Sequence, residues 1–363
     1  MNEQYKLDEW SHHGEVYEKL EDDSVRCFSC AHRCLIHEGK RGICKVRYNK
    51  GGELRVPWGY VAGAASDPIE KKPFNHFLPG STAFTFGMLG CNFHCSFCQN
   101  WVSSQALRDP EAANLSNPPT RVTAERLVEY AWSDMAQVMA SSYNEPLITS
   151  EWAVEIFKLA RAKGLKTVMV SNGYATPEVL NYVRPWLDGY KIDLKSMNPA
   201  NYRDMGGQLQ CVLDSIKLAI DLGLWVEVVT LVIPGMNDSQ EELWEASRFL
   251  ASVSRDIPWH VTAFHPDYKM EDGLPTPAEK LKEAAEIGQE AGLHYVYAGN
   301  IPGRVGSLEN TYCPKCGNAL INRRGYMLQS YKITAEGKCS FCGEKIAGIW
   351  TDHPDEIRYS SWF

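Results

Sequence analysis

Between residues 81 and 300, short apolar runs alternate with segments that carry helix start signals. Several of the runs are almost continuously apolar, as is typical of parallel strands buried on both faces. This alternation predicts a parallel sheet whose strands are joined by helices in right-handed crossovers, either open and doubly wound or closed toward a TIM-like barrel. The predicted strands are residues 82–88, 136–142, 165–171, 190–194, 224–233, 259–265 and 295–298.

Helix start and stop signals separate these strands. A serine or threonine followed by acidic residues predicts a helix N-cap, and a glycine after the last turn predicts a helix end. The expected N-caps are Thr123, Ser150, Thr176, Ser239 and Thr276, and the expected terminal glycines are Gly164, Gly223 and Gly292. Together these signals indicate six or seven βα units.

The chain changes character on either side of this core. Residues 1–80 have little helical periodicity and many glycine and proline turn signals, which indicate an extension that needs a metal or a neighbouring domain to fold. After residue 300 the alternation of strands and helices stops. We therefore predict an α/β protein with a cysteine-rich N-terminal metal-binding extension at 1–80, a partial TIM-like (βα)6 parallel barrel at 81–300, and a C-terminal zinc-ribbon-like module at 301–363.

Composition narrows the possible classes of function. The 363 residues carry a formal net charge of -8 and have a pI of about 5.7, which argues against broad electrostatic capture of nucleic acid or of an anionic membrane. The first residues lack the basic segment and apolar run of a signal peptide, and no apolar run reaches the roughly 18 residues of a membrane span. We expect a cytoplasmic protein whose cysteines are reduced.

Eleven of the 12 cysteines fall into three clusters. The loop after the first predicted strand places Cys91, Cys95 and Cys98 in a CxxxCxxC spacing. A structural zinc site or an ordinary iron–sulfur cluster uses four protein ligands, so three cysteines indicate a metal centre with one open position. Phe93 and His94, which lie between the ligands, are expected to pack rather than to bind metal.

The two other clusters contain four cysteines each. The sequences CPKCG and CSFCG near the C-terminus are typical of the knuckles of a structural zinc ribbon, with Cys313, Cys316, Cys339 and Cys342 as ligands. The N-terminal set consists of Cys27, Cys30, Cys34 and Cys44, and its spacing predicts a metal site without deciding between zinc and an iron–sulfur cluster. Cys211 stands alone, and we interpret it as a small hydrophobic residue.

Polar residues follow the predicted strands. In parallel α/β proteins, ligands bind at the carboxyl ends of the strands. After the cysteine loop, the successive strand ends carry residues 143–146 (YNEP), 171–173 (SNG), 193–195 (DLK), 234–238 (PGMND) and 265–267 (HPD). We therefore expect a ligand site at this edge of the sheet, with the cysteine loop as its floor.

The CxxxCxxC loop after the first strand of a six-unit βα core resembles the radical S-adenosylmethionine (SAM) superfamily, in its branch related to pyruvate formate-lyase activating enzymes. Residues 67–77 (DPIEKKPFNHF), 98–101 (CQNW) and 143–146 (YNEP) resemble the AmmeMemoRadiSam-system radical SAM proteins, and this resemblance covers nearly the whole chain. At residues 143–146 the sequence departs from the Gly-Gly-Glu-Pro that is usual in the superfamily.

The resemblance implies a 4Fe-4S cluster on Cys91, Cys95 and Cys98, whose fourth iron binds the amino and carboxylate groups of SAM. Reductive cleavage of SAM then gives methionine and a 5′-deoxyadenosyl radical, which abstracts hydrogen from a substrate. The implied SAM contacts are Phe97 at the adenine, Asn144 and Glu145 at the ammonium, Ser171 and Asn172 at the ribose or carboxylate, and Asp193 and Lys195 at the methionine end or the ribose. His265 is a candidate acid, base or substrate contact.

The resemblance also implies partners, namely a reductant such as flavodoxin or ferredoxin, and Memo-like and AMMECR-like proteins. The residues identify neither the substrate nor an interface. One alternative is an activating enzyme that installs a radical on the glycine backbone of a partner protein. An alternative of another class is a non-catalytic multi-metal scaffold or zinc-ribbon binding protein, against which stand the three-cysteine open site and the acidic pI.

Overall fold

The computed structural model describes residues 7–357 and Tyr359. The chain divides into two compact units, each assembled from separate stretches. The first comprises Met1–Ser66, Ala83–Tyr190 and Arg203–Leu224, and the second comprises Asp67–Thr82, Lys191–Tyr202 and Trp225–Phe363. These units interleave along the chain, whereas the three domains expected from the sequence are consecutive, and that three-part division stays a prediction.

The first unit contains parallel strands β9 (Thr82–Gly87), β11 (Val138–Ser141) and β12 (Lys166–Ser171). β11 is the central strand, because Met139 lies opposite Phe84 of β9 on one side and Thr167 of β12 on the other. All four residues of β11 are buried, which explains its uninterrupted apolar character. β13 (Gly189–Asp193) begins in this unit, where the Asp188 N–H donates to the Thr167 carbonyl.

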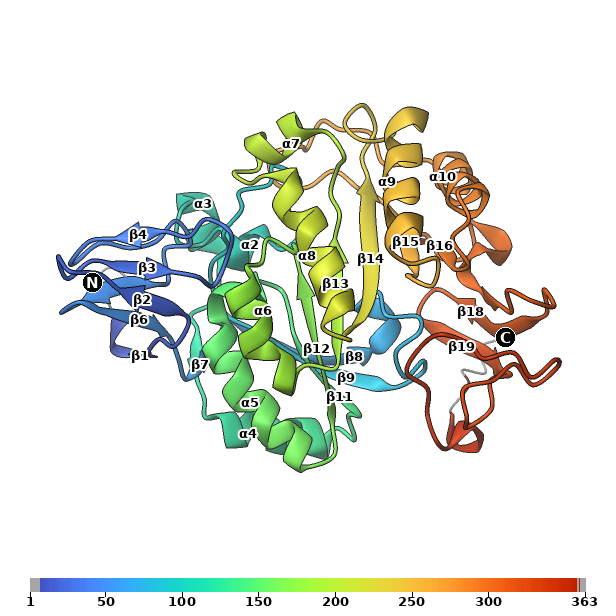
Figure 1. The fold of residues 1–363 in the computed structure, drawn as a ribbon, viewed down its shortest axis with the longest axis horizontal. Helices are drawn as coiled ribbons and strands as arrows, with labels where there is room; N and C mark the ends of the chain where they lie inside the picture. The colour runs from blue at the N-terminus through green and yellow to red at the C-terminus, as the bar shows by residue number, and fades with distance from the viewer. Residues whose placement is uncertain (1–6, 358, 360–363) are drawn as a thin grey trace. The chain divides into compact units, whose positions relative to one another are not determined.

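Helices connect these strands. In the first unit they are α4 (Ala124–Ser133), α5 (Ser150–Ala162), α6 (Pro177–Val183) and α8 (Leu209–Asp221), and α5 lies against β11 and β12 (Figure 1). Thr123 and Thr176 cap α4 and α6 as predicted. The side chain of each accepts a hydrogen bond from the backbone N–H three residues later in the chain. The prediction for Ser150 is wrong by one residue. α5 begins at Ser150 itself, because a 3-10 turn, η2 (Pro146–Thr149), runs directly into it.

The second unit continues the alternation with β14 (Trp225–Val232), β15 (Trp259–Ala263) and β16 (Val296–Gly299), all parallel. β13 ends here, where the Leu194 N–H donates to the Val229 carbonyl. α9 (Gln240–Val253) and α10 (Ala278–Glu290) connect the strands, and α10 lies against β15 and β16 (Figure 1). The predicted strands and the α/β fold with a parallel sheet are therefore confirmed.

Two capping predictions in this unit have different outcomes. Ser239 accepts a hydrogen bond from the Glu242 N–H and caps α9 as expected. Thr276 does not cap α10, whose N-cap position is Pro277. The Thr276 hydroxyl instead donates to the Val232 carbonyl at 2.5 Å and accepts from the Phe264 N–H at 2.8 Å. The hydroxyl that the sequence pattern predicts as a helix cap therefore binds residues distant in the sequence.

Short antiparallel strands make up the N-terminal part of the first unit. β1 (Ser11–His13), β5 (Tyr48–Lys50) and β6 (Glu53–Pro57) form one sheet in the order β1-β6-β5, and β2 (Tyr17–Lys19), β3 (Val25–Cys27) and β4 (Leu35–Ile36) form another in chain order. β7 (Tyr60–Val61) pairs with β10 (Thr120–Arg121), and β8 (Gly63–Pro68) follows β7. The helices α2 (Trp101–Ser104) and α3 (Pro110–Leu115) follow the cysteine loop.

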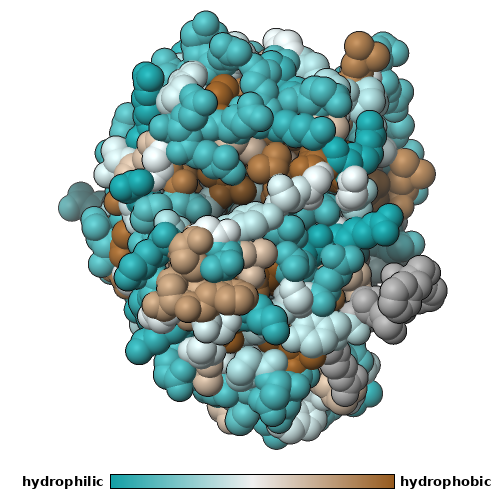
Figure 2. Space-filling model, turned by 90° about the vertical axis from the view of Figure 1, so that its right-hand side faces the viewer, coloured by the Kyte–Doolittle hydropathy of each residue, from teal (hydrophilic) through white to brown (hydrophobic). Residues whose placement is uncertain are grey.

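The C-terminal part of the second unit is also antiparallel, with β17 (Thr311–Tyr312), β18 (Ala319–Arg324) and β19 (Met327–Tyr331) in chain order. Its core contains Leu320, Ile321 and the cysteine Cys313. On the face shown in Figure 2, hydrophilic residues predominate and hydrophobic ones form separate patches. Among the helices of the described residues, none is both long enough and apolar enough to cross a lipid bilayer.

The segment Asp67–Thr82 packs within the second unit through a buried polar network. Glu227 of β14 is fully buried and accepts hydrogen bonds from the backbone N–H groups of Asn75 and His76, each at 2.9 Å. It also accepts from His260 at 2.7 Å. The Arg323 guanidinium of β18 donates to the Asn75 carbonyl at 2.8 Å. The network explains part of the unusual sequence at residues 67–77, to which the sequence alone assigned no role.

Candidate cofactor site

The CxxxCxxC loop follows β9 after a left-handed turn at Gly90, whose φ is +96°. Cys95 is buried, while Cys91 and Cys98 are partly exposed. Burial, the nearby Glu145 carboxylate and the Cys95 thiol raise the pKa of Cys91 well above its ordinary value. The Cys91 thiol donates toward Asn92 Oδ1 at 3.7 Å, and metal binding requires that it lose this proton.

The three sulfurs are not arranged around a single ion. Among the described residues, only the C-terminal cysteines bring three or more ligand atoms within 4.8 Å of one another, so Cys91, Cys95 and Cys98 do not. An iron–sulfur cluster binds each thiolate through a different iron, which requires a wider spacing than one zinc ion does. The loop therefore fits a cluster with three protein ligands better than it fits a single metal ion.

Hydrogen-bond donors gather at the first cysteine. The Phe93 N–H lies 3.4 Å from the Cys91 Sγ, and Asn172 Nδ2 lies 4.0 Å from it. Asn92 is fully buried, yet its Nδ2 has no hydrogen-bond partner. A buried amide without an acceptor is costly, and an anionic cluster or ligand would supply the acceptor. This unpartnered donor indicates that the loop is built around a group that the polypeptide does not itself provide.

Glycines hold the cysteine loop in place. The His94 N–H donates to the Met205 carbonyl at 3.1 Å. A Cβ on Gly206 would lie 2.5 Å from the His94 ring, and a Cβ on Gly207 would lie 2.5 Å from the Phe93 ring. Phe93 and His94 thus pack against this turn, as predicted.

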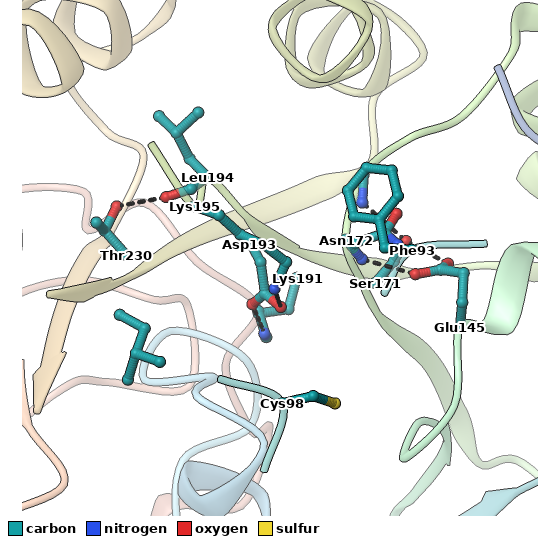
Figure 3. A network of polar contacts seen from close by, with 12 residues as sticks. Phe93, Cys98, Glu145, Ser171, Asn172, Lys191, Asp193, Leu194, Lys195 and Thr230 are labelled. Carbon is teal, nitrogen blue, oxygen red and sulfur yellow. Dashed lines mark hydrogen bonds and ion pairs between the residues drawn. The ribbon is translucent and has the colours of Figure 1, made fainter. Parts of the chain in front are cut away.

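Glu145 organises two strand ends of the first unit. Its Oε1 accepts from Ser171 Oγ at 2.7 Å, and its Oε2 accepts from the Asn172 N–H at 2.8 Å (Figure 3). Its Oε1 also accepts from the Leu147 N–H at 3.0 Å. Asn172 Nδ2 in turn donates to Asn92 Oδ1 at 2.7 Å. The structure therefore brings Glu145, Ser171 and Asn172 together beside the cysteine loop, as the strand-end pattern predicts.

The loop between β11 and η2 keeps a backbone shape suited to glycine. Tyr143 has a φ of +72°, in the left-handed region that disfavours residues with a Cβ. Its position corresponds to a glycine in the usual Gly-Gly-Glu-Pro sequence. Asn144 is fixed because its Oδ1 accepts from the Met88 N–H at 2.9 Å and its Nδ2 donates to the Glu145 carbonyl at 3.2 Å. The loop geometry is thus held by hydrogen bonds despite the tyrosine.

Asp193, at the end of β13, belongs to a charged group in the second unit. It forms ion pairs with Lys191 and with Lys195, the latter at 2.9 Å (Figure 3). Burial opposes ionisation, but the two lysine charges prevail and lower the pKa of Asp193 to about 2. Lys191 was not predicted as a site residue, although residues two apart on a strand share a face and the run from 191 to 195 carries charges at that spacing.

Two other strand-end residues of the second unit have separate roles. Asn237 is buried, and its Nδ2 donates to the carbonyls of Lys195 and Leu231 at 2.7 and 2.8 Å, which fixes the loop after β14. The side chain of His265 is 54% exposed and lies 4.0 Å from an oxygen of Asp267. The contacts of His265 do not show whether it acts as an acid, as a base or in substrate binding, and its role stays a prediction.

The four C-terminal cysteines form a compact metal-type site. Their sulfurs all lie within 4.8 Å of one another, with 3.6 Å between Cys313 and Cys342 and 3.8 Å between Cys316 and Cys339. A tetrahedral zinc ion with sulfurs at about 2.3 Å places those sulfurs about 3.8 Å apart. The N–H groups of Asn318 lower the pKa of Cys316 to about 6, which favours the thiolate that metal binding requires.

Comparison with known proteins places this site in a family. The model of the radical SAM superfamily matches residues 86–250, which include the cysteine loop and the strand ends up to Asn237. A protein of Methanocaldococcus jannaschii named "Uncharacterized protein MJ0808" is 40% identical over 333 residues, covering 91% of this chain and 97% of the relative. The chain belongs to the radical SAM superfamily.

More distant relatives of this radical SAM enzyme have named activities. A pyruvate formate-lyase-activating enzyme of Streptococcus mutans is 22% identical over 209 residues, covering 55% of this chain and 78% of the relative. The crystal structure of a domain of such an enzyme from Bacteroides vulgatus aligns with a TM-score of 0.40 and 20% identity, covering 44% of this chain and 98% of that domain. Membership in an enzyme superfamily leaves the non-catalytic scaffold without support.

Proposed function

We propose that this enzyme cleaves SAM reductively at a 4Fe-4S cluster held by Cys91, Cys95 and Cys98, and that the resulting 5′-deoxyadenosyl radical abstracts hydrogen from a substrate. The observation that carries the proposal is the three-cysteine loop, whose sulfurs do not all lie within 4.8 Å of one another, with the unpartnered, buried Asn92 Nδ2 beside it. Three thiolates leave one iron for a ligand other than the protein.

The cluster and SAM, when bound, supply the radical chemistry, and the chain supplies position and shielding. We propose that Phe97, which is 4% exposed, contacts the adenine. Glu145, which follows β11, connects this strand end to the end of β12 by accepting hydrogen bonds from Ser171 and Asn172. Asn144, Ser171 and Asn172 then present polar atoms toward SAM.

In the second unit we propose that Asp193 and Lys195 bind the methionine end or the ribose of SAM. Two lysines stabilise the Asp193 carboxylate, so it stays ionised at neutral pH and acts only as a hydrogen-bond acceptor. Lys195 remains a cationic donor for a ligand carboxylate. His265 is proposed to act on the substrate as an acid, base or contact.

Finer assignments follow from sequence motifs. Residues 67–77, 98–101 and 143–146 support membership in the AmmeMemoRadiSam-system group, and with it association with Memo-like and AMMECR-like proteins. We also propose a flavodoxin or ferredoxin as the electron donor. The sulfur spacing of 3.6 and 3.8 Å supports structural zinc at the C-terminal cysteines.

A second candidate is the activation of a partner protein by hydrogen abstraction from a glycine of its backbone. The relatives named pyruvate formate-lyase-activating enzyme, from Streptococcus mutans and from Clostridium pasteurianum, favour this reading. A persistent radical signal on a co-purifying polypeptide after turnover would support it. Deuterium transferred from a deuterated small molecule into 5′-deoxyadenosine would instead support a small-molecule target.

The deciding experiment measures 5′-deoxyadenosine and methionine after anaerobic reconstitution with iron, sulfide and a reductant. We expect equal amounts of both products from the unaltered enzyme and at most about a hundredth of these amounts from Cys95→Ala, because the cluster loses a ligand. Cys211→Ser, which removes the lone thiol, is the matched control and should retain the activity. Undiminished 5′-deoxyadenosine from Cys95→Ala would refute the proposal.

A further inference from the structure

The four N-terminal cysteines lie together in the first unit. Cys27 ends β3, Cys30 and Cys34 lie in the turn that leads to β4, and Cys44 lies in the turn before β5. The Cys27 N–H donates to the Cys34 carbonyl at 3.0 Å, which closes the first turn. Cys27, Cys30 and Cys44 are each at most 5% exposed. Three or four thiols gathered in an apolar interior are unusual unless they bind a metal group.

These sulfurs do not close around one point. In the described part of the chain no three of them lie within 4.8 Å of one another, whereas the C-terminal set does. The first set is therefore close together and still wider than a tetrahedral zinc site.

The packing of the cysteines explains the wider spacing. Cys27 belongs to an apolar cluster with Val25 and Ile36, against which Cys34 also packs. Cys44 belongs to another cluster, with Val46 and Ile148. The cysteines are therefore held by two separate apolar clusters rather than by one.

We propose that Cys27, Cys30, Cys34 and Cys44 hold an iron–sulfur cluster with all its irons bound to cysteine. Each thiolate of such a cluster binds a different iron, which suits the observed spacing. Because four thiolates occupy four irons, no iron is open, and this cluster does not bind SAM. The inference concerns a second metal site and does not depend on the activity proposed for Cys91, Cys95 and Cys98.

The surroundings suit an anionic cluster. Arg47 is 1% exposed, and its Nη1 lies 3.9 Å from the Cys27 Sγ and 3.0 Å from Glu151 Oε1. The Ser29 hydroxyl lies 3.4 Å from the same sulfur. A buried cation and a hydroxyl at the sulfur stabilise negative charge on the cluster and shift its reduction potential.

The same cysteine segment contacts the open-site loop. His32, between Cys30 and Cys34, has its Nε2 3.1 Å from the carbonyl oxygen of Asn92, and Asn92 is the residue after Cys91. One side chain therefore joins the two cysteine loops within the first unit.

The test uses the full-length triple variant Cys91→Ala, Cys95→Ala, Cys98→Ala, reconstituted anaerobically and analysed for iron, acid-labile sulfide and zinc. We expect about four irons and four sulfides per chain from the remaining cluster, and about eight of each in the unaltered protein. After reduction, the electron paramagnetic resonance signal of the triple variant should not change when SAM is added, because no iron is open.

Three results would overturn the proposal: a triple variant without iron, a triple variant with two zinc ions per chain, or a cluster signal that SAM alters. Adding Cys30→Ser to the triple variant should lower the iron content by at least half, whereas adding Cys211→Ser should leave it unchanged. Circular dichroism identifies a variant that fails to fold. In that case, Mössbauer spectra of the unaltered protein provide the second measurement, and they must resolve a cluster that is insensitive to SAM.

Discussion

The buried ion pair between Arg47 and Glu151 gives the sharpest prediction about stability. Both side chains are 1% exposed. Glu151 accepts from Arg47 Nη1 at 3.0 Å, from the Ser150 hydroxyl at 3.0 Å and from the Glu15 N–H at 3.2 Å. Although burial disfavours a carboxylate, the Arg47 charge lowers the pKa of Glu151 below its ordinary value. The pair therefore stays ionised, and it fastens the N-terminal segment to the start of α5.

Glu151→Gln keeps the shape of the side chain and leaves the Arg47 charge buried without its counterion. Removing one partner of a buried pair costs about 3–5 kcal/mol, so the unfolding equilibrium should shift about 150- to 4,000-fold. At a urea dependence of about 3 kcal/mol per M, the midpoint of urea unfolding falls by about 1–1.7 M. Circular dichroism of the holoprotein measures this shift.

The controls distinguish a buried charge from general damage. Glu129→Gln removes the partner of Arg126 in an exposed pair with side chains 61% and 56% exposed, and it should cost less than about 1 kcal/mol. The double variant Arg47→Met, Glu151→Gln should be more stable than Glu151→Gln alone, because it removes the unpaired charge. A midpoint shift of Glu151→Gln no larger than that of Glu129→Gln would refute the reasoning.

Three further predictions concern the loop, a buried acid and the C-terminal site. Gly207→Ala places a Cβ 2.5 Å from the Phe93 ring and should lower the iron bound at the open site at least twofold. The control is Gly63→Ala, whose added Cβ would have no neighbouring atom within 4 Å, and equal iron contents in the two variants would contradict the prediction. Burial raises the pKa of Glu70 from 4.5 to about 7, although the charge of Arg323, 3.9 Å away, opposes the shift. The stabilising effect of Glu70 is therefore full below pH 4.5 and lost as the pH rises through 7, so Glu70→Gln should lose less unfolding free energy than the unaltered protein between pH 4.5 and pH 8, and an equal loss in both proteins would exclude this cause. Cys316→Ser should release about one zinc per chain, measured by metal analysis, without loss of iron, and loss of both metals would show that the sites are not independent.

Much of the core could be read from the sequence because local and tertiary preferences agree there. The run at residues 224–233 is apolar because β14 is almost wholly buried, and Thr123 caps α4 with a contact inside its own first turn. Thr276 shows the opposite case. Its local pattern is that of a cap, but the Val232 carbonyl and the Phe264 N–H compete for its hydroxyl, and neither partner can be identified from neighbouring residues.

The candidate site was predictable to the same extent. The cysteine loop and Glu145 could be found because each lies directly after a strand, and strand ends converge in parallel sheets. Arg47 could not be found in this way. Its partner Glu151 is 104 residues away, and a lysine or arginine in a turn-rich segment is normally solvated. The sequence alone therefore predicts a solvated Arg47, and this prediction is wrong, because the side chain is 1% exposed.

The buried network of residues 67–82 delays the folding of this segment until late in synthesis. The Asn75 carbonyl receives its hydrogen bond from Arg323, 248 residues later, and His76 Nδ1 lies 2.7 Å from the carbonyl oxygen of Ala347, 271 residues later. At about 5–20 residues per second, a ribosome needs roughly 12–50 s to add the first of these partners. Throughout this interval the nascent chain exposes an apolar and charged segment whose polar groups still lack these hydrogen-bond partners. The C-terminal module thus acts as the last piece of the fold, and a chain released early lacks the groups that bury its own residues 67–82.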